Sequence, residues 1–232
     1  YAMLNVIGPK SRKLLEKVSS DNISNEALGF SQCRDITVGY ARATALRVTY
    51  VGELGYELYI PTEFAAHVYE TLWEAGQEFN VKNAGYRAVD SLHFEKGYSY
   101  WGSEVTPEYT PYDAGLGFCV DLSKENFIGR DALMKAKDKE PEYVLATFTL
   151  EYDAPVRVRG SEPVIYNGEV LGVTTSGGYG YTVGKTILYG YIPVEHADHG
   201  SDYEIEVYKK TYKAKIEKTR ALYDPKRERI LM

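Results

Sequence analysis

The stretch TYVGELGYELYIP (residues 49–61) combines the pattern of a β-hairpin with two carboxylates. Its second half, residues 56–60, alternates with the period of two typical of a strand, so Glu57 and Tyr59 are predicted to share one face. The glycines at 52 and 55 predict a turn that joins this strand to an earlier one over residues 40–51. Glu53 lies in the turn, where a solvated carboxylate is ordinary. Glu57 lies within the strand, where a half-buried carboxylate needs hydrogen-bond donors. The residues alone leave a solvated hairpin and a ligand-facing carboxylate equally open.

The sequence around this hairpin predicts a mixed α+β region over residues 1–138. We expect strands over residues 1–8 and 118–122, and helices over residues 11–18, from 61–62 onward, 84–96 and 126–137. Gly97 is a plausible C-terminal cap for the helix over 84–96. Residues 19–35 and 106–117 have the composition of loops.

The pattern changes after the charged break at residues 138–141. Short alternating runs follow at intervals of roughly ten residues, separated by glycine and proline, and this spacing predicts an antiparallel sandwich or barrel. The runs are VLATFTL, EPVIY, EVLGVTTS, ILYGYIP, DYEIEVY and TYKAKIE. We therefore expect an α+β domain over 1–138 and a C-terminal antiparallel β-barrel domain over 142–232.

Composition limits the possible partners and compartments. The 232 residues carry a net charge of −6, which disfavours nucleic acid because phosphate binding requires a concentrated basic surface. No apolar run approaches the ~20 residues of a membrane span. Cys33 and Cys119 match no metal or redox spacing, and we expect reduced thiols in a cytoplasmic protein. The chain begins at Tyr1 within a strand-like run, so we expect a piece of a longer polypeptide.

Two motifs suggest sites that the spacing does not support. The segment GYGYTVGKT (residues 178–186) ends like a phosphate-binding loop, but the first required glycine is replaced by Tyr179. A glycine-rich hairpin between barrel strands explains this segment better. His196 and His199 have metal-like spacing but follow Pro193 in a predicted surface turn, so we predict no metal site. No G-x-G-x-x-G motif is present, so we predict no nucleotide-binding fold for a flavin or nicotinamide.

A resemblance resolves the question about the hairpin. TYVGELGYELYIP followed by AGYRAVDSLHFEKGYSYWGSE (residues 84–104) resembles the glycine-cleavage T-protein superfamily of tetrahydrofolate-dependent aminomethyltransferases. TPYDAGLGF (110–118) and NFIGRDAL (126–133) most resemble the C-terminal half of dimethylglycine and sarcosine dehydrogenases and oxidases. The segment 159–193 is similar to the C-terminal barrel of the superfamily. The likeness extends from about Met3 to Tyr223.

The resemblance implies a set of folate-binding residues. The tyrosine and last glutamate of Y-x-G-E-x-G-x-E are Tyr50 and Glu57 here, and the family implies that they line the folate pocket. An aromatic residue before the W-G glycine, Trp101, borders the site in relatives, together with Tyr98; a packed core role for Trp101 stays open. Many members carry an arginine where this chain has His93, which puts affinity or recognition of the folate tail in doubt. Arg87 does not obviously replace it.

The resemblance also implies an activity for the parent protein. An N-methyl amine is oxidised at a flavin in an upstream domain, and tetrahydrofolate captures the one-carbon unit as 5,10-methylenetetrahydrofolate. The family's key aspartate lies upstream of the matching region, so we expect no catalytic residue in this chain and no activity from it alone. In a eukaryote the resemblance favours the mitochondrial matrix. Alternatives are a stand-alone glycine-cleavage T-protein, a relative linked to iron–sulfur protein maintenance, and a non-catalytic regulatory homologue.

Overall fold

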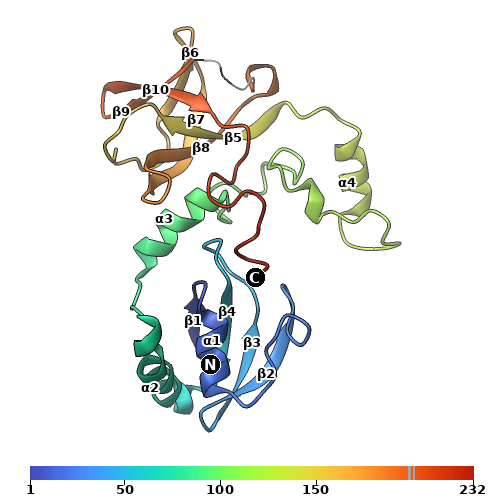
Figure 1. The fold of residues 1–232 in the computed structure, drawn as a ribbon. Helices are drawn as coiled ribbons and strands as arrows, with labels where there is room; N and C mark the ends of the chain where they lie inside the picture. Colours follow the sequence, from blue (N-terminus) through green and yellow to red (C-terminus); the bar gives the residue numbers. More distant parts are fainter. Residues whose placement is uncertain (198–199, 201) are drawn as a thin grey trace. The chain divides into compact units, whose positions relative to one another are not determined.

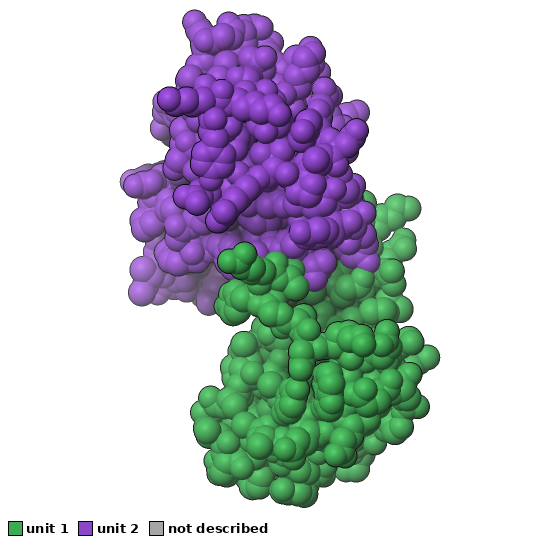
Figure 2. All heavy atoms as spheres, turned by 90° about the vertical axis from the view of Figure 1, so that its left-hand side faces the viewer, with its two compact units in different colours: residues 1–89, 224–232 green, residues 90–223 purple. Residues whose placement is uncertain are grey.

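The structure is a computed structural model that describes residues 1–197, 200 and 202–232 (Figure 1). The chain forms two compact units, which Figure 2 distinguishes by colour. Unit 1 comprises residues 1–89 and 224–232, and unit 2 comprises residues 90–223. The chain therefore passes from one unit to the other twice. These units are bounded differently from the predicted domains 1–138 and 142–232, which remain a prediction.

Unit 1 is built on a four-stranded antiparallel sheet in the order β1-β4-β3-β2. Its elements are β1 (Ala2–Ile7), α1 (Ser11–Val18), β2 (Cys33–Val38), β3 (Ala41–Leu46), β4 (Gly55–Ile60), η1 (Thr62–Phe64), α2 (Ala65–Gly76) and η2 (Gln77–Phe79). The predicted helix over 11–18 is confirmed. The predicted strand over 40–51 is too long, because β3 ends at Leu46. The prediction of a loop over 19–35 is wrong at its end, where β2 begins at Cys33.

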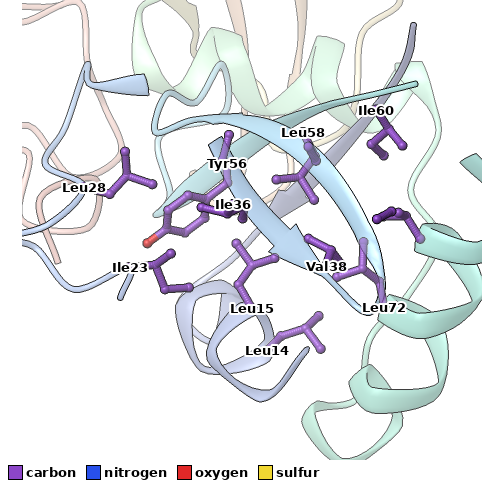
Figure 3. Packing of buried hydrophobic residues seen from close by; sticks show 14 of the residues in the cluster. Leu14, Leu15, Ile23, Leu28, Ile36, Val38, Tyr56, Leu58, Ile60 and Leu72 are labelled. Atoms are coloured by element: carbon purple, nitrogen blue, oxygen red, sulfur yellow. The ribbon is translucent and has the colours of Figure 1, made fainter. Parts of the chain in front are cut away.

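One face of this sheet packs against both helices. Leu14 and Leu15 of α1 and Val68 and Leu72 of α2 lie in one buried cluster with residues from β2, β3 and β4. Figure 3 shows Leu14, Leu15 and Leu72 between the helices and the sheet, together with side chains of the sheet such as Ile36 and Val38. The strand alternation predicted for β4 is confirmed, because Tyr56, Leu58 and Ile60 are fully buried in this cluster. The intervening residues of β4 therefore point to the opposite face of the sheet.

The helix α3 (Tyr86–Lys96) leads into unit 2 and ends where the sequence predicts. Gly97 has a φ of 75°, in the left-handed region that favours glycine after a helix. The predicted strand over 118–122 is wrong, because residues Gly117–Cys119 form the short helix η3. The predicted helix over 126–137 is shorter in the structure, where α4 spans Arg130–Lys137.

The rest of unit 2 is a closed antiparallel barrel in the strand order β10-β5-β8-β7-β6-β9. The strands are β5 (Tyr143–Leu150), β6 (Pro163–Tyr166), β7 (Glu169–Gly180), β8 (Lys185–Pro193), β9 (Tyr203–Val207) and β10 (Lys210–Ile216), with η4 (Val194–His196) after β8. Each of the six alternating runs of the sequence overlaps one of these strands, so the predicted barrel is confirmed. Closure pairs each of these six strands with a neighbour on both sides.

The phosphate-loop look-alike is a hairpin, as predicted. Residues 181–184 connect β7 to β8, which pair in antiparallel register from Thr174 to Gly180. The buried carboxylate of Glu95 in α3 accepts hydrogen bonds from the backbone N–H groups of Thr182 (2.6 Å) and Val183 (3.0 Å). A Cβ at Gly180 would lie 2.9 Å from Glu95 Oε1, so the glycine makes room for this carboxylate. The hairpin amides are therefore occupied by a protein carboxylate.

Candidate functional site

The segment that carries Tyr50 is an irregular loop between β3 and β4. Its entry is fixed by Arg47, whose side chain is buried and donates to the backbone carbonyl of Leu28 at 3.1 Å. Burial, followed by the nearby charge of Arg12, lowers the pKa of Arg47. Tyr50 is partly exposed in this loop, so the prediction that it lies in a strand over 40–51 is wrong.

The exit of the loop is held against the first strand and helix of unit 1. The backbone carbonyl of Leu54 accepts hydrogen bonds from Gly8 N–H (2.8 Å) and the Ser11 hydroxyl (3.3 Å). Gly55 is confined, since a Cβ there would lie 3.1 Å from Ile7 and 3.2 Å from the carbonyl oxygen of Val48. These contacts set the start of β4 and thereby fix the position of Glu57 two residues later.

Glu57 and Tyr59 lie together on the face of the sheet opposite the core. Both are partly exposed, and the Tyr59 hydroxyl donates a hydrogen bond to Glu57 Oε2 at 2.9 Å. This bond, with the charge of Glu57, raises the pKa of the Tyr59 phenol because it stabilises the protonated form. A carboxylate has about four acceptor positions, and Tyr59 occupies one of them. Sequence alternation placed Tyr59 on this face, but its contact with the carboxylate was not predicted.

The remaining predicted site residues belong to unit 2, with His93 in α3 and Tyr98 and Trp101 in the loop that follows it. His93 is fully buried, with ring centroids of Phe94 and Tyr100 at 4.0 and 4.4 Å from its own. Tyr98 is partly exposed, and its backbone N–H donates to the carbonyl of His93 at 3.1 Å. Trp101 is 77% exposed, so it is not packed in the core of unit 2. Binding roles for these three residues remain predictions.

A buried carboxylate that the sequence reasoning did not single out supports the loop of Tyr98 and Trp101. Glu104 is fully buried, and its Oε2 accepts a hydrogen bond from the backbone N–H of Tyr100 at 2.9 Å. Its Oε1 accepts the hydroxyls of Ser103, Thr175 and Ser176. The W-G-S-E tetrapeptide was a visible signal, but its partners on β7 are about 70 residues away in sequence.

In residues 1–197, 200 and 202–232, no three His, Cys, Asp or Glu side chains gather closely enough to hold a metal ion. His196 lies in η4 with its ring 5.5 Å from that of Tyr166, whereas His199 lies outside the described residues. Cys33 and Cys119 are free and exposed. Within the described part of the chain, every helix is too short or too polar to cross a bilayer.

Two family models match the chain. Residues 1–124 match the GCVT N-terminal domain, and residues 144–224 match the glycine cleavage T-protein C-terminal barrel domain. The second match coincides with the six-stranded barrel. The first spans residues 1–89 of unit 1 and the loop that carries Tyr98 and Trp101, so all five predicted binding residues fall within it.

Individual proteins give the same result. The chain is 41% identical over 231 residues to 4-methylaminobutanoate oxidase (formaldehyde-forming) from Paenarthrobacter nicotinovorans, and 37% identical over 230 residues to mitochondrial dimethylglycine dehydrogenase from Homo sapiens. These matches cover 99% and 98% of the chain but only 28% and 26% of the relatives, about a quarter of their length. The structure superposes on glycine cleavage system aminomethyltransferase T from Bartonella henselae with a TM-score of 0.82 and 26% identity, covering 96% of this chain and 60% of that one.

Proposed function

This chain belongs to the glycine cleavage T-protein family, and from that premise we propose that it is the tetrahydrofolate-binding, one-carbon-transfer region of a larger N-methyl amine oxidoreductase. The observation that carries the proposal is the position of Glu57. This carboxylate lies on the face of the sheet that the core does not use, and its orientation is fixed by a hydrogen bond from Tyr59.

The chemistry of a pterin matches such a carboxylate. One edge of the pterin presents a ring N–H beside an exocyclic NH₂, and the two oxygens of a carboxylate accept both. Tyr59 leaves about three acceptor positions on Glu57 for this pair. Tyr50, in the loop before β4, supplies an aromatic ring that stacks on flat heterocycles or a hydroxyl that bonds to them. In our proposal Tyr98 and Trp101 contribute further folate contacts, as the family motif implies, and His93 occupies the position where many relatives carry a folate-associated arginine.

The proposed reaction divides the work between this chain and an upstream domain. An N-methyl amine such as sarcosine or dimethylglycine loses two electrons at a flavin outside this chain and becomes an iminium. The amine then leaves without its methyl carbon, which passes to tetrahydrofolate as 5,10-methylenetetrahydrofolate. The residues of this chain bind the folate, orient its nitrogen toward the electrophile and exclude water. We propose a cytoplasmic protein, or one of the mitochondrial matrix in a eukaryote.

Calorimetric titration with tetrahydrofolate tests the proposal. We expect Glu57→Gln to weaken binding at least about tenfold, because an amide replaces one charged acceptor with a donor that faces the pterin N–H groups. Glu53→Gln is the matched control. Glu53 belongs to the same motif but lies in the turn, 3.8 Å from Arg229 Nε, and its replacement should leave the affinity unchanged.

Two results would count against the proposal. Absence of tetrahydrofolate binding by both this chain and its parent contradicts the folate assignment, and equal affinities for Glu57→Gln and the unmodified chain contradict the role of Glu57. A further measurement separates the enzyme from a regulatory homologue. The intact parent should form 5,10-methylenetetrahydrofolate when an N-methyl amine is supplied, whereas folate binding without this product favours the regulator, with which His93 at the arginine position is compatible.

A further inference from the structure

The loop after α3 is closed on itself and presents one exposed tryptophan. Gly102 N–H donates to the carbonyl of Val105 at 2.8 Å, and Val105 N–H donates to the carbonyl of Tyr100 at 3.1 Å. Trp101 pairs with Val105 in a short bridge and remains 77% exposed. A large aromatic side chain in water on a tightly bonded loop is a candidate for binding a flat ligand.

Glu104 joins this loop to the barrel. Oε2 accepts from the backbone N–H of Tyr100, and Oε1 accepts from Ser103, so both contacts lie within the loop. The same Oε1 accepts from Thr175 at 2.8 Å and from Ser176, both on β7. The backbone carbonyl of Glu104 in turn accepts from the Tyr191 hydroxyl at 2.8 Å, on the adjacent strand β8.

Arg220 holds the other end of the loop. Its guanidinium donates to the hydroxyl of Ser99 and, at 2.7 Å, to the backbone carbonyl of Ala114. It also lies over the ring of Tyr189, 5.9 Å from the centroid. Gly97 packs directly on the Arg220 backbone, since a Cβ there would lie 2.6 Å from the Arg220 carbonyl carbon. The residues on both sides of Tyr98 are thus tied to Arg220.

We propose that Glu104 and Arg220 are positioning residues that fix Trp101 and Tyr98 for folate binding, an inference that rests on the proposed function. A buried carboxylate is a costly way to gain stability alone, because removing the charge from water offsets much of what its hydrogen bonds contribute. Its value here is geometric. Four hydrogen-bond donors surround the planar carboxylate of Glu104 and restrict the conformation of the loop. Position matters because a displacement of about 1 Å at a site can cost ~10²-fold in rate.

The chain provides a matched control for this role. Glu162, like Glu95 and Glu104, is a buried carboxylate of unit 2, and it accepts the backbone N–H groups of Arg159 (2.7 Å) and Gly160 (2.9 Å). It also accepts the hydroxyl of Thr174, the neighbour of Thr175 on β7. Glu162→Gln therefore removes a similar network from the same strand, but from a loop that carries none of the predicted folate contacts.

The experiment uses the whole chain with Trp73→Phe, which leaves Trp101 as the single tryptophan because the sequence contains two. Fluorescence anisotropy and acrylamide quenching then report the mobility and exposure of Trp101 without any ligand. We expect Glu104→Gln and Arg220→Gln to lower the anisotropy, increase the quenching, and weaken tetrahydrofolate binding roughly tenfold or more. Glu162→Gln should change neither the Trp101 signal nor the affinity, whatever its effect on the melting temperature.

The outcomes separate this inference from the proposed function. If the reference chain and its parent bind no tetrahydrofolate, the proposed function fails, and the Trp101 signal still decides whether Glu104 positions the loop. A folded Glu104→Gln variant with unchanged anisotropy overturns the inference, as does an equal response to Glu162→Gln. If Glu104→Gln does not fold, Thr175→Val removes one donor while the charge remains, and it should produce a smaller change in the same direction; no change overturns the inference.

Discussion

The Tyr59 hydroxyl and Glu57 form the contact on which the candidate site depends, and the contact can be measured directly. The hydrogen bond to Glu57 raises the pKa of Tyr59 above the ordinary tyrosine value of about 10. We expect Glu57→Gln to lower the pKa of Tyr59, because the carboxylate acceptor and its charge are both lost. Carbon NMR of chains labelled at tyrosine Cζ measures this pKa, with Tyr59→Phe assigning the resonance. An unchanged Tyr59 titration in Glu57→Gln would refute the contact.

The same shift gives a pH dependence of stability. The folded-state pKa of Tyr59 is raised, so its contribution to stability is complete below the unfolded-state pKa of about 10 and is lost as the pH rises through the folded-state pKa. The difference in unfolding free energy between the unmodified chain and Tyr59→Phe should therefore be constant near pH 7 and fall in alkaline solution. Urea unfolding across this pH range measures it. A difference that grows with pH would reverse the assigned sign.

For single residues, the local sequence pattern predicted on which face of the sheet a side chain lies, but not which other side chains it contacts. Alternation correctly placed Glu57 and Tyr59 on one face, since strand geometry depends only on neighbouring residues. The network of Glu104 was missed because Thr175 and Ser176 lie about 70 residues away, and the fold alone brings them together. The burial of His93 was likewise not predicted, because it depends on the packing of Phe94 and Tyr100 around the imidazole.

Among the elements, two barrel hairpins make the same kind of turn with different residues. The β6–β7 turn uses Asn167 and Gly168, with φ of 50° and 83°, whereas the β9–β10 turn uses Tyr208 and Lys209, with φ of 51° and 63°. Asn-Gly is the favoured pair for two-residue hairpins of this conformation, because both positions need positive φ. Only the first hairpin therefore carries a turn signal in its sequence.

This difference predicts opposite effects of matched substitutions. Lys209→Gly should raise the free energy of unfolding by about 1 kcal/mol, because it removes the cost of a left-handed backbone at a residue with a side chain. Gly168→Lys should lower it by about the same amount, and for backbone reasons alone, since a Cβ at Gly168 meets no atom within 4 Å. Thermal unfolding of the two variants measures both effects. If both variants change the free energy of unfolding in the same direction, the backbone conformation of the turn does not determine these changes.

The elements themselves were predictable to different degrees. The six barrel strands and α1 followed from apolar periodicity, which is strong where one face is buried. The errors lie where periodicity is weak. The strand expected over 118–122 is absent, and the short helix η3 (Gly117–Cys119) forms at its start. No residue of η3 is buried, so the apolar residues there do not pack against a core. β2 was missed in part because its first three residues are exposed.

For the whole molecule, the C-terminal segment has a role that no local pattern indicates. Residues 224–232 belong to unit 1, although the chain between passes through all of unit 2. Ile230 is 1% exposed, and the backbone carbonyl of Met232 accepts hydrogen bonds from Arg12 and Arg47, each at 2.6 Å. Arg229 lies 3.8 Å from Glu53 in the loop before β4. The sequence prediction included residues 224–232 in the barrel domain over 142–232 and identified no core residue among them.

The stability of unit 1 should therefore depend on this segment. Ile230→Ala removes most of a buried side chain and should lower the free energy of unfolding by about 2–4 kcal/mol. Leu231→Ala is the matched control, since Leu231 is 50% exposed and its truncation should change stability by no more than about 0.5 kcal/mol. Urea unfolding followed by the fluorescence of Trp73, in a Trp101→Phe chain, reports unit 1 in particular. Equal stabilities of the two alanine variants would contradict a stabilising role for the segment, because Ile230 is buried whereas Leu231 is half-exposed.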